Sequence, residues 1–324
     1  MIESWFAIIV GLIFLVWSAD RFVMGASATA QNLGVSPLII GMIIVGFGTS
    51  APEIFVGAIA AIGGNSTMAV GNALGSNIAN IGLVVGLAAL ITPLTIESNI
   101  LKREFPLLFV VTAAAYLVMS DNTLSRMDGI LLLVGTAAMV GWLFKLSTSD
   151  NPKDPLETEF ESELPERMST GRGLLWTLLG LIILVASSHT LVWGAVNVAK
   201  AFGVSEFIIG LTIIAIGTSL PEVAVSITAA LKKEHDIVIG NIIGSNMFNL
   251  LAVLGVASTI QPSTLQPEVL NRDFLVMAVL TLGLFVMGYG FKGKGRINRF
   301  EASLLLCAYF GYLYWLYTTL NSVE

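Results

Sequence analysis

The sequence has few charged residues. Asp, Glu, Lys and Arg make up 12% of its 324 residues, about half the share that is usual in soluble proteins. Hydrophobic residues make up 55%, and the mean hydropathy is +0.85. These values exclude a nucleic-acid-binding protein and most soluble enzymes. The composition instead predicts a polytopic membrane protein with the lipid bilayer as its surroundings and no nucleic-acid partner.

Cysteine and histidine are also scarce. The single cysteine, Cys307, cannot form a disulfide within the chain, and His189 and His235 lie outside the polar motifs described below. Zn²⁺ and Cu favour imidazole and sulfur ligands, so a transition-metal site is not expected. The sequence predicts no cofactor, no enzymatic activity and no obligatory protein partner.

Apolar stretches long enough to cross about 30 Å of hydrocarbon recur along the chain. They occupy residues 4–33, 36–62, 66–91, 101–119, 126–146, 172–200, 205–231, 236–260, 270–290 and 298–320. We therefore predict an all-α polytopic membrane protein with ten transmembrane helices. The only long polar segment, residues 147–171, is expected to be a solvated acidic linker between two five-helix halves, residues 1–146 and 172–324.

Basic residues predict the orientation of the chain, because Lys and Arg collect in cytoplasmic loops. Twelve lie on one side of the predicted membrane and three on the other, with Arg21 inside the first stretch. The richer side includes the acidic linker, which is therefore expected to be cytoplasmic. Both termini are expected to be external, and the protein to lie in the inner cell membrane.

The two halves share an internal repeat. Residues 34–105 align without gaps on residues 203–274 at an offset of 169, with 30 identities in 72 positions. Five spans in each half make the second copy enter the membrane from the opposite side. The sequence therefore predicts inverted repeats, an arrangement found in many secondary transporters.

Each repeat carries one glutamate, Glu53 or Glu222, near the middle of an apolar span, where an ionisable side chain is costly. The glutamate ends a Gly-Thr-Ser-x-Pro-Glu motif, whose proline removes an amide donor and breaks the helix. Threonine and glutamate are four residues apart and share a helix face. Broken helices are therefore expected at the centre of the protein, with Thr49, Ser50, Thr218 and Ser219 beside the acids.

A second motif, Gly-Asn-x-x-Gly-Ser-Asn-x-x-Asn, follows in both repeats and adds further oxygen donors. They are Ser76 and Asn80 in the first copy and Ser245 and Asn249 in the second. Carboxylate, amide and hydroxyl oxygens suit hard cations such as Ca²⁺ and Na⁺. An alternative interpretation treats both glutamates as neutral packing residues. Their matching positions in two broken helices favour the cation site.

On these motifs the sequence resembles the sodium/calcium exchanger branch of the cation/calcium antiporter superfamily, along essentially the whole chain. The resemblance implies inverted five-plus-five helices, a central cation cluster, and sliding of the long first and sixth helices. It assigns cation ligation to Thr49, Ser50, Glu53, Ser76, Asn80, Thr218, Ser219, Glu222, Ser245 and Asn249, with the backbone oxygens of Gly46 and Ala215.

One position departs from the family pattern. Many relatives have Asp where this chain has Asn249, so the cluster has one acid fewer. Proton-coupled relatives tend to have Glu where this chain has Gly75 and Gly244, which favours Na⁺ over H⁺. The expected function is secondary antiport that exports Ca²⁺ in exchange for Na⁺ by alternating access. The alternatives are a Ca²⁺/H⁺ or K⁺-assisted exchanger and, from another class, a cation channel.

Overall fold

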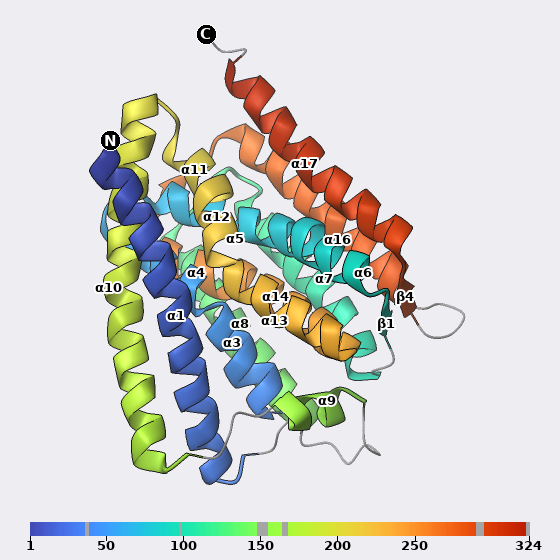
Figure 1. The fold of residues 1–324 in the computed structure, drawn as a ribbon. Coiled ribbons are helices and arrows are strands. Elements are labelled where there is room, and N and C mark those ends of the chain that lie inside the picture. Colours follow the sequence, from blue (N-terminus) through green and yellow to red (C-terminus); the bar gives the residue numbers. More distant parts are fainter. Residues whose placement is uncertain (36–38, 97–98, 148–154, 164–167, 290–294, 322–324) are drawn as a thin grey trace.

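The computed structural model describes residues 1–35, 39–96, 99–147, 155–163, 168–289 and 295–321, which are mostly helical (Figure 1). The first half contains α1 (Ile2–Asn32), η1 (Ile40–Val45), α3 (Gly46–Thr49), α4 (Ala51–Ile62), α5 (Ser66–Ala79), η2 (Asn80–Val85), α6 (Gly86–Ile91), α7 (Asn99–Met119) and α8 (Arg126–Ser147). After α9 (Pro155–Glu163), the second half contains α10 (Thr170–Phe202), α11 (Glu206–Ile209), η3 (Gly210–Ile214), α12 (Ala215–Thr218), α13 (Leu220–Lys232), α14 (His235–Phe248), η4 (Asn249–Val253), α15 (Leu254–Ile260), η5 (Val269–Phe274), α16 (Leu275–Gly288) and α17 (Arg299–Asn321).

Between six and eight of these helical ranges are long and apolar enough to cross a membrane. Six are continuous, namely Ile2–Asn32, Ser66–Ile91, Arg126–Lys145, Thr170–Phe202, His235–Ile260 and Val269–Gly288. Two more are bent pairs, Ile43–Thr49 with Ala51–Ile62 and Glu206–Thr218 with Leu220–Lys232. The two remaining predicted spans, residues 101–119 and 298–320, correspond to α7 and α17, which are not among these six to eight ranges. The described residues thus form a polytopic membrane protein, while ten spans and the inversion of the halves remain predictions.

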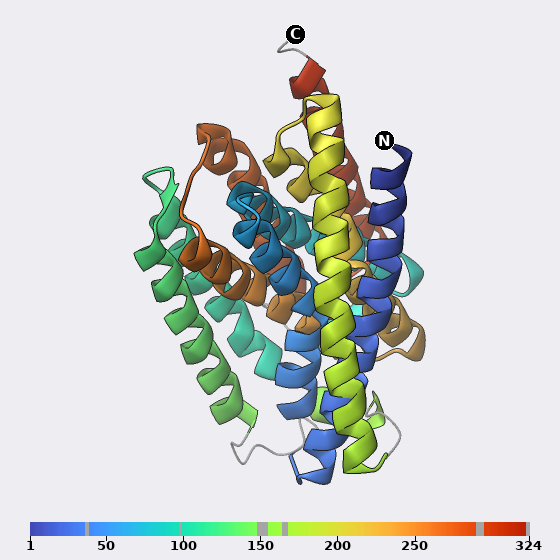
Figure 2. The same ribbon diagram turned by 90° about the vertical axis from the view of Figure 1, so that its left-hand side faces the viewer.

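The two longest helices, α1 and α10, lie side by side along their length (Figures 1 and 2). Small residues permit this contact: a Cβ at Gly194 of α10 would lie 2.7 Å from the carbonyl oxygen of Ser4. At Gly11 of α1 it would lie 3.0 Å from Leu191 Cβ. Close packing of glycine against a neighbouring backbone is the usual way in which apolar helices associate in membranes.

The helices that carry the second motif form the interior. In the ranges Ser66–Ile91 and His235–Ile260, 78% and 89% of the most apolar window is buried, against 22% for Arg126–Lys145. A helix that is buried all round can carry polar side chains only where they bond to one another. The interior position of α5 and α14 therefore places the motif asparagines and serines at the centre of the bundle.

Contacts between the halves recur in equivalent pairs. Arg126 donates its Nε to the carbonyl oxygen of Thr259 at 3.0 Å, and Arg299 donates its Nε to that of Leu90 at 3.1 Å. Leu90 and Thr259 are separated by the repeat offset. Each arginine thus binds the last carbonyls of a helix in the other half, a favourable position for a cation. Short antiparallel pairs, β1 (Leu94–Ile96) with β4 (Gly295–Ile297) and β2 (Thr123–Leu124) with β3 (Ser263–Thr264), also join the halves.

The acidic linker differs from the expected solvated segment. It contains α9, whose side chains Leu156 and Phe160 are buried, at 0% and 8% exposure. In Figures 1 and 2, α9 lies at the end of the bundle opposite the N-terminus of α1 and the C-terminal end of α17. The described helix of the linker is therefore at one end of the molecule, and the start of α1 and the end of α17 are at the other.

Candidate cation site

Two broken helices form the frame of the site, as the proline motifs predict. Pro52 and Pro221 lie at the start of α4 and α13, where they have no N–H to continue the preceding helix. The chain bends there by 48° in the first half and 41° in the second. The bend makes a new helix N-terminus directly before each glutamate, and the positive end of a helix dipole favours a carboxylate.

Glu53 and Glu222 are both fully buried, and each accepts a hydrogen bond from the serine of the second motif in its own half. Ser245 Oγ donates to Glu222 Oε1 at 3.0 Å, and Ser76 Oγ donates to Glu53 Oε1 at 3.5 Å. The two pairs occupy equivalent positions of the repeat. Each broken helix is thereby tied to the interior helix that follows it.

The hydroxyl groups also join the two halves. Ser50 Oγ donates to Ser245 Oγ at 3.1 Å, and Ser76 Oγ lies 3.4 Å from Thr218 Oγ1. All four residues are buried. The predicted ligands of the two repeats therefore belong to one contiguous cluster, and Ser219 is buried at the second break.

The predicted backbone ligands lie at the same breaks. The Gly46 carbonyl oxygen is 3.3 Å from Thr49 Oγ1, and the Ala215 carbonyl oxygen is 3.4 Å from Thr218 Oγ1. Both carbonyls also accept the backbone N–H of the serine that follows the threonine. These oxygens belong to the polar region, although each already accepts bonds from its own chain segment.

Two further asparagines, Asn72 and Asn241, complete the site, and the sequence interpretation gave them no role. Thr49 Oγ1 donates to Asn241 Oδ1 at 3.2 Å, and Thr218 Oγ1 donates to Asn72 Oδ1 at 3.1 Å. Their occurrence at the same place in both copies of the second motif was the available signal. To interpret this signal, one would need to know that the second motif of one half packs against the broken helix of the other half.

Asn80 and Asn249 begin the π-helical segments η2 and η4 and bond across the interface between the halves. Asn80 Nδ2 donates to Asn246 Oδ1 at 3.0 Å and to Ser245 Oγ at 3.1 Å. Asn249 Nδ2 donates to Asn77 Oδ1 at 3.0 Å. π-helical turns are frequent at functional sites.

Several buried oxygens of the predicted ligands have no donor among the described residues. They are Glu53 Oε2, Glu222 Oε2, Asn80 Oδ1, Asn249 Oδ1 and Ser219 Oγ. A buried acceptor without a donor is costly and is rare in proteins. A bound cation would satisfy these oxygens, and they are of the kind that Ca²⁺ and Na⁺ prefer.

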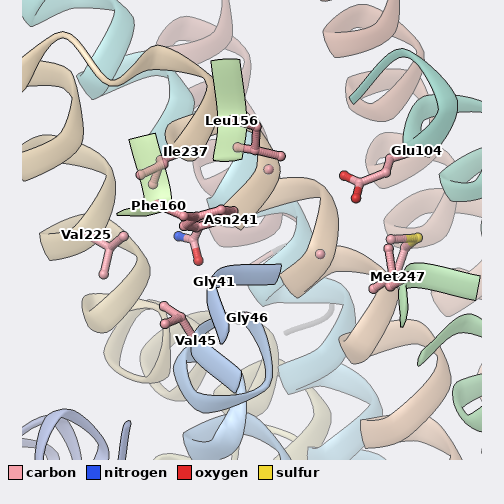
Figure 3. Close-up of a pocket in the computed structure, with 13 residues that line it drawn as sticks. Gly41, Val45, Gly46, Glu104, Leu156, Phe160, Val225, Ile237, Asn241 and Met247 are labelled. Carbon is pink, nitrogen blue, oxygen red and sulfur yellow. The ribbon is translucent and has the colours of Figure 1, made fainter. Parts of the chain in front are cut away.

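Two hollows touch this cluster, and a third adjoins the first of them. A small cavity of about 20 Å³ is lined by Gly46, Asn241 and Gly244 and is seen in Figure 3. A groove of about 610 Å³ between α1 and α13 reaches Thr49 and Pro221. A third, of about 440 Å³, extends from Val225 toward the end of the molecule where α9 lies. Within the described part of the chain, no three His, Cys, Asp or Glu side chains are grouped so as to hold a metal, so any ligand set must rely on amide and hydroxyl oxygens.

Comparison with known proteins identifies the family. The sequence profile described as sodium/calcium exchanger protein matches residues 3–145 and 172–318. The chain belongs to this family. Over 98% of its length it is 49% identical to a protein from Alkalimonas amylolytica named antiporter CaxA, and the match covers 100% of that protein. It is 30% identical to the sodium/calcium exchanger MaX1 of Methanosarcina acetivorans over 79% of this chain and 82% of that protein.

A solved structure of this family has the same fold. The sodium-calcium exchanger NCX_Mj, soaked with 10 mM Na⁺ and 10 mM Sr²⁺, matches with a TM-score of 0.67 and 30% identity, over 96% of this chain and 98% of that one. The protein is also 44% identical to the inner membrane protein YrbG of Escherichia coli, over 79% of each chain. These matches show that the protein is a membrane antiporter of the sodium/calcium exchanger family. This is a family of transporters and not of enzymes.

Proposed function

We propose that the protein exports Ca²⁺ across the inner cell membrane in exchange for Na⁺, by alternating access to the central cluster. The supporting observation is the set of buried oxygens that have no donor among the described residues; they belong to Glu53 and Asn80 of one half and to Glu222, Asn249 and Ser219 of the other. The hydroxyls of Thr49, Ser50, Ser76, Thr218, Ser219 and Ser245, and the carbonyls of Gly46 and Ala215, complete the proposed ligand set.

The charge of this cluster explains how the two ions exclude one another. Two carboxylates are neutralised by one Ca²⁺ or by two Na⁺, and a further Na⁺ would have to rest on neutral oxygens such as those of Asn80 and Asn249. Ions that compete for the same two negative charges cannot occupy the cluster together, so one must leave before the other binds. Exchange follows when the site opens alternately to the two sides.

The arrangement of the chain supports an orientation for this exchange. The linker side has the larger number of basic residues in the sequence, and α9 of the linker lies opposite the start of α1 and the end of α17 (Figure 1). We propose that the linker is cytoplasmic and that both termini are external. The long helices α1 and α10, which contact the broken segments, would slide to alternate access.

Flux measurements in proteoliposomes test this function. Vesicles loaded with Na⁺ and diluted into Na⁺-free buffer should accumulate Ca²⁺, whereas vesicles with only a K⁺ or an H⁺ gradient should not. Ca²⁺ uptake driven by the H⁺ gradient, or requiring K⁺ together with Na⁺, would support the alternative exchangers. Ca²⁺ flux that needs no counter-ion gradient would identify a channel and overturn the proposal.

A further inference from the structure

The first inference concerns Asn77 and Asn246, which are equivalent positions of the repeat and which the proposed ligand set does not include. Both are buried, at 1% and 0% exposure. Asn77 Oδ1 accepts the Nδ2 of Asn249, and Asn246 Oδ1 accepts the Nδ2 of Asn80, both at 3.0 Å. Each therefore binds the amide nitrogen of a proposed ligand in the opposite half.

An amide whose nitrogen is held on one side must present its oxygen on the other. Asn80 Oδ1 and Asn249 Oδ1 are buried and have no donor among the described residues, as expected of oxygens directed at a cation. We propose that Asn77 and Asn246 are positioning residues that fix the amide orientation of Asn249 and Asn80. This inference rests on the proposed function.

The two positioning residues differ in one respect that permits a sharp test. Asn77 Nδ2 donates to the carbonyl oxygen of Asn246 at 3.2 Å, whereas Asn246 Nδ2 has no partner within the described ranges. Asn246→Asp therefore loses no hydrogen bond and keeps an acceptor for Asn80, but Asn246→Ala removes that acceptor. A packing role predicts the opposite order, because a carboxylate is harder to bury than a methyl group.

The experiment measures the half-saturating Ca²⁺ concentration and the maximal rate of Na⁺-driven flux, per folded protein. Asn246→Ala and Asn77→Ala should each raise the half-saturating concentration about tenfold, the effect of one lost buried hydrogen bond, and Asn246→Asp should not raise it. Ser258→Ala is the control, since this buried serine bonds only to the Leu254 carbonyl of its own helix in the described structure.

Two results would overturn the inference. One is an unchanged Ca²⁺ affinity in both alanine variants, and the other is a larger loss in Asn246→Asp than in Asn246→Ala. The proposed function is tested separately by Glu53→Gln. If Glu53→Gln abolishes flux while the alanine variants behave as the parent does, only the positioning role is wrong.

The second inference concerns α9 and rests on independent contacts. Leu156 and Phe160 are four residues apart and buried, while Thr158 and Glu161 on the same helix are exposed. The ring of Phe160 packs so closely on η1 that a Cβ at Gly41 would lie 2.2 Å from it. Only glycine at position 41 admits the ring, so α9 is docked in a specific place.

The docked helix also binds the interior helix α14. Glu159 Oε2 accepts the backbone N–H of Ile237 at 2.8 Å, in the first turn of α14. The first amides of a helix lack partners within the helix, and a side-chain carboxyl oxygen satisfies one of them here. α14 carries Asn241 and Ser245 of the candidate site, and η4, which continues it, begins at Asn249. The linker is therefore connected to one of the helices that form the candidate site.

Figure 3 shows the small cavity between α9 and the candidate site. Gly46 and Asn241 line it on the side of the site, and Leu156 and Phe160 line it on the side of the linker. Its volume of about 20 Å³ is room for roughly one water molecule. Phe160 also lines the larger hollow that contains Val225 and Ile237. The two apolar side chains thus lie between the candidate site and the linker end of the molecule.

We propose that α9 is a plug that closes the route to the site from the linker end and that must leave its place for ions to pass there. The effect of the plug on transport rests on the proposed function, but its effect on access to the site does not. Phe160→Ala and Leu156→Ala should release the plug, and Gly41→Ala should expel it by steric clash.

Access is measured by the labelling rate of Val225→Cys with a membrane-impermeant thiol reagent, in a Cys307→Ser background. Phe160→Ala and Gly41→Ala should each raise this rate about tenfold from the linker side, and the double variant should add nothing further. Thr158→Ala and Glu161→Ala, on the exposed face of α9, are the controls. The thermal unfolding midpoint, which should hardly change, shows that the bundle is intact.

An unchanged labelling rate in both Phe160→Ala and Gly41→Ala would overturn the plug. Faster labelling without faster Na⁺-driven Ca²⁺ flux from the linker side would show that α9 covers the route but does not limit transport, which would overturn its regulatory role. Labelling does not depend on transport, so a failure of the proposed function is distinguished from a failure of the plug.

Discussion

The hydroxyl of Thr49 donates to the amide oxygen of Asn241, a residue 192 positions away, at 3.2 Å. Thr218 makes the equivalent bond to Asn72 at 3.1 Å. In each case the broken helix of one half is held by the interior helix of the other. Movement of either half relative to its partner would therefore disturb both broken helices together, which suits a site that must open and close as a unit.

The first prediction concerns the carboxylates. Glu53→Gln and Glu222→Gln should each reduce Na⁺-driven Ca²⁺ flux to background, because each removes half of the negative charge available to Ca²⁺. The folded protein should remain in the membrane, since glutamine can still accept from Ser76 or Ser245. Flux in proteoliposomes at matched reconstitution is the measurement, with Glu3→Gln, an exposed residue in the first turn of α1, as the control. Near-normal flux in either variant would restore the interpretation of the acids as packing residues.

The second prediction uses an asymmetry between equivalent glycines. A Cβ at Gly75 would lie 2.3 Å from the carbonyl oxygen of Leu211 and 2.7 Å from Ala215 Cβ, whereas a Cβ at Gly244 would meet nothing within 4 Å. Gly75→Ala should therefore lower the free energy of unfolding by about 1–3 kcal/mol through overpacking. Gly244→Ala should leave it unchanged or raise it slightly, because alanine favours helix.

Thermal unfolding of both variants in one detergent is the measurement. Equal midpoints for the two alanine variants would show that the contact of α5 with η3 is not as close as described.

These glycines also show how far the sequence predicts the molecule. The repeat offset marks equivalent positions of the two halves, those of the candidate site included, but it predicts identical surroundings for Gly75 and Gly244. The surroundings differ because α5 packs directly on η3 at Gly75, whereas Gly244 of α14 lines the small cavity beside Gly46. The offset likewise gives no hint that Asn77 and Asn246 bond to Asn249 and Asn80 of the opposite half, since partners across an interface depend on packing and not on spacing.

The linker shows a second limit. Its seven acidic residues predict a solvated segment, and most of the segment gives no other signal. Leu156 and Phe160 have the spacing of an apolar helix face, but two residues are too few to distinguish a docked helix from a soluble one. The docking of α9 depends on Gly41, whose lack of a side chain leaves room for the Phe160 ring. Because Gly41 lies in another part of the chain, the linker sequence alone does not reveal this contact.

The third prediction is a pH dependence of linker docking. The pKa of Glu159 is raised from its usual 4.5 to about 8, mainly by burial; the charges of Asp236 and Glu234 add to the shift, and the hydrogen bond from the Ile237 amide opposes it. A raised pKa in the docked state means that docking is strongest below pH 4.5, where both states are protonated. It weakens as the pH rises from 4.5 to about 8, where the undocked carboxyl has ionised and the docked one is still protonated, and it changes no further once both are ionised.

Access of the thiol reagent to Val225→Cys from the linker side should therefore increase between pH 5 and 9, after correction for the reactivity of a free thiol. Glu159→Gln, which resembles the protonated acid, should flatten this increase. Glu161→Gln, exposed on the same helix, serves as the control. A pH profile that Glu159→Gln does not alter would show that another group governs docking.

The fourth prediction concerns orientation. In a Cys307→Ser background, Thr158→Cys should be labelled from the cytoplasm and Val323→Cys from outside, because basic residues are concentrated on the side of the linker. Right-side-out and inside-out vesicles with an impermeant reagent provide the measurement. Labelling of both positions from the same side would contradict the ten-span topology.

The last prediction concerns Asn249, where many exchangers have an acid. Asn249→Asp places a third carboxylate in the cluster that contains Glu53 and Glu222, and it replaces the Nδ2 donor that binds Asn77 Oδ1 at 3.0 Å. Three like charges repel one another when no cation is bound, so a proton or an additional cation must compensate them. Protons then compete with Ca²⁺ for the site.

We expect acidification to suppress Ca²⁺ transport by Asn249→Asp more than transport by the parent, with little loss of stability because the polar neighbours can accommodate the new group. A pH series of Na⁺-driven Ca²⁺ flux at matched reconstitution is the measurement. The asparagine at position 77 makes the prediction sharper: its amide must turn to donate to the new carboxylate, and it then loses its own bond to the Asn246 carbonyl. Superimposable pH profiles would place residue 249 outside the ion cluster, and with it, by the symmetry of the repeat, Asn80.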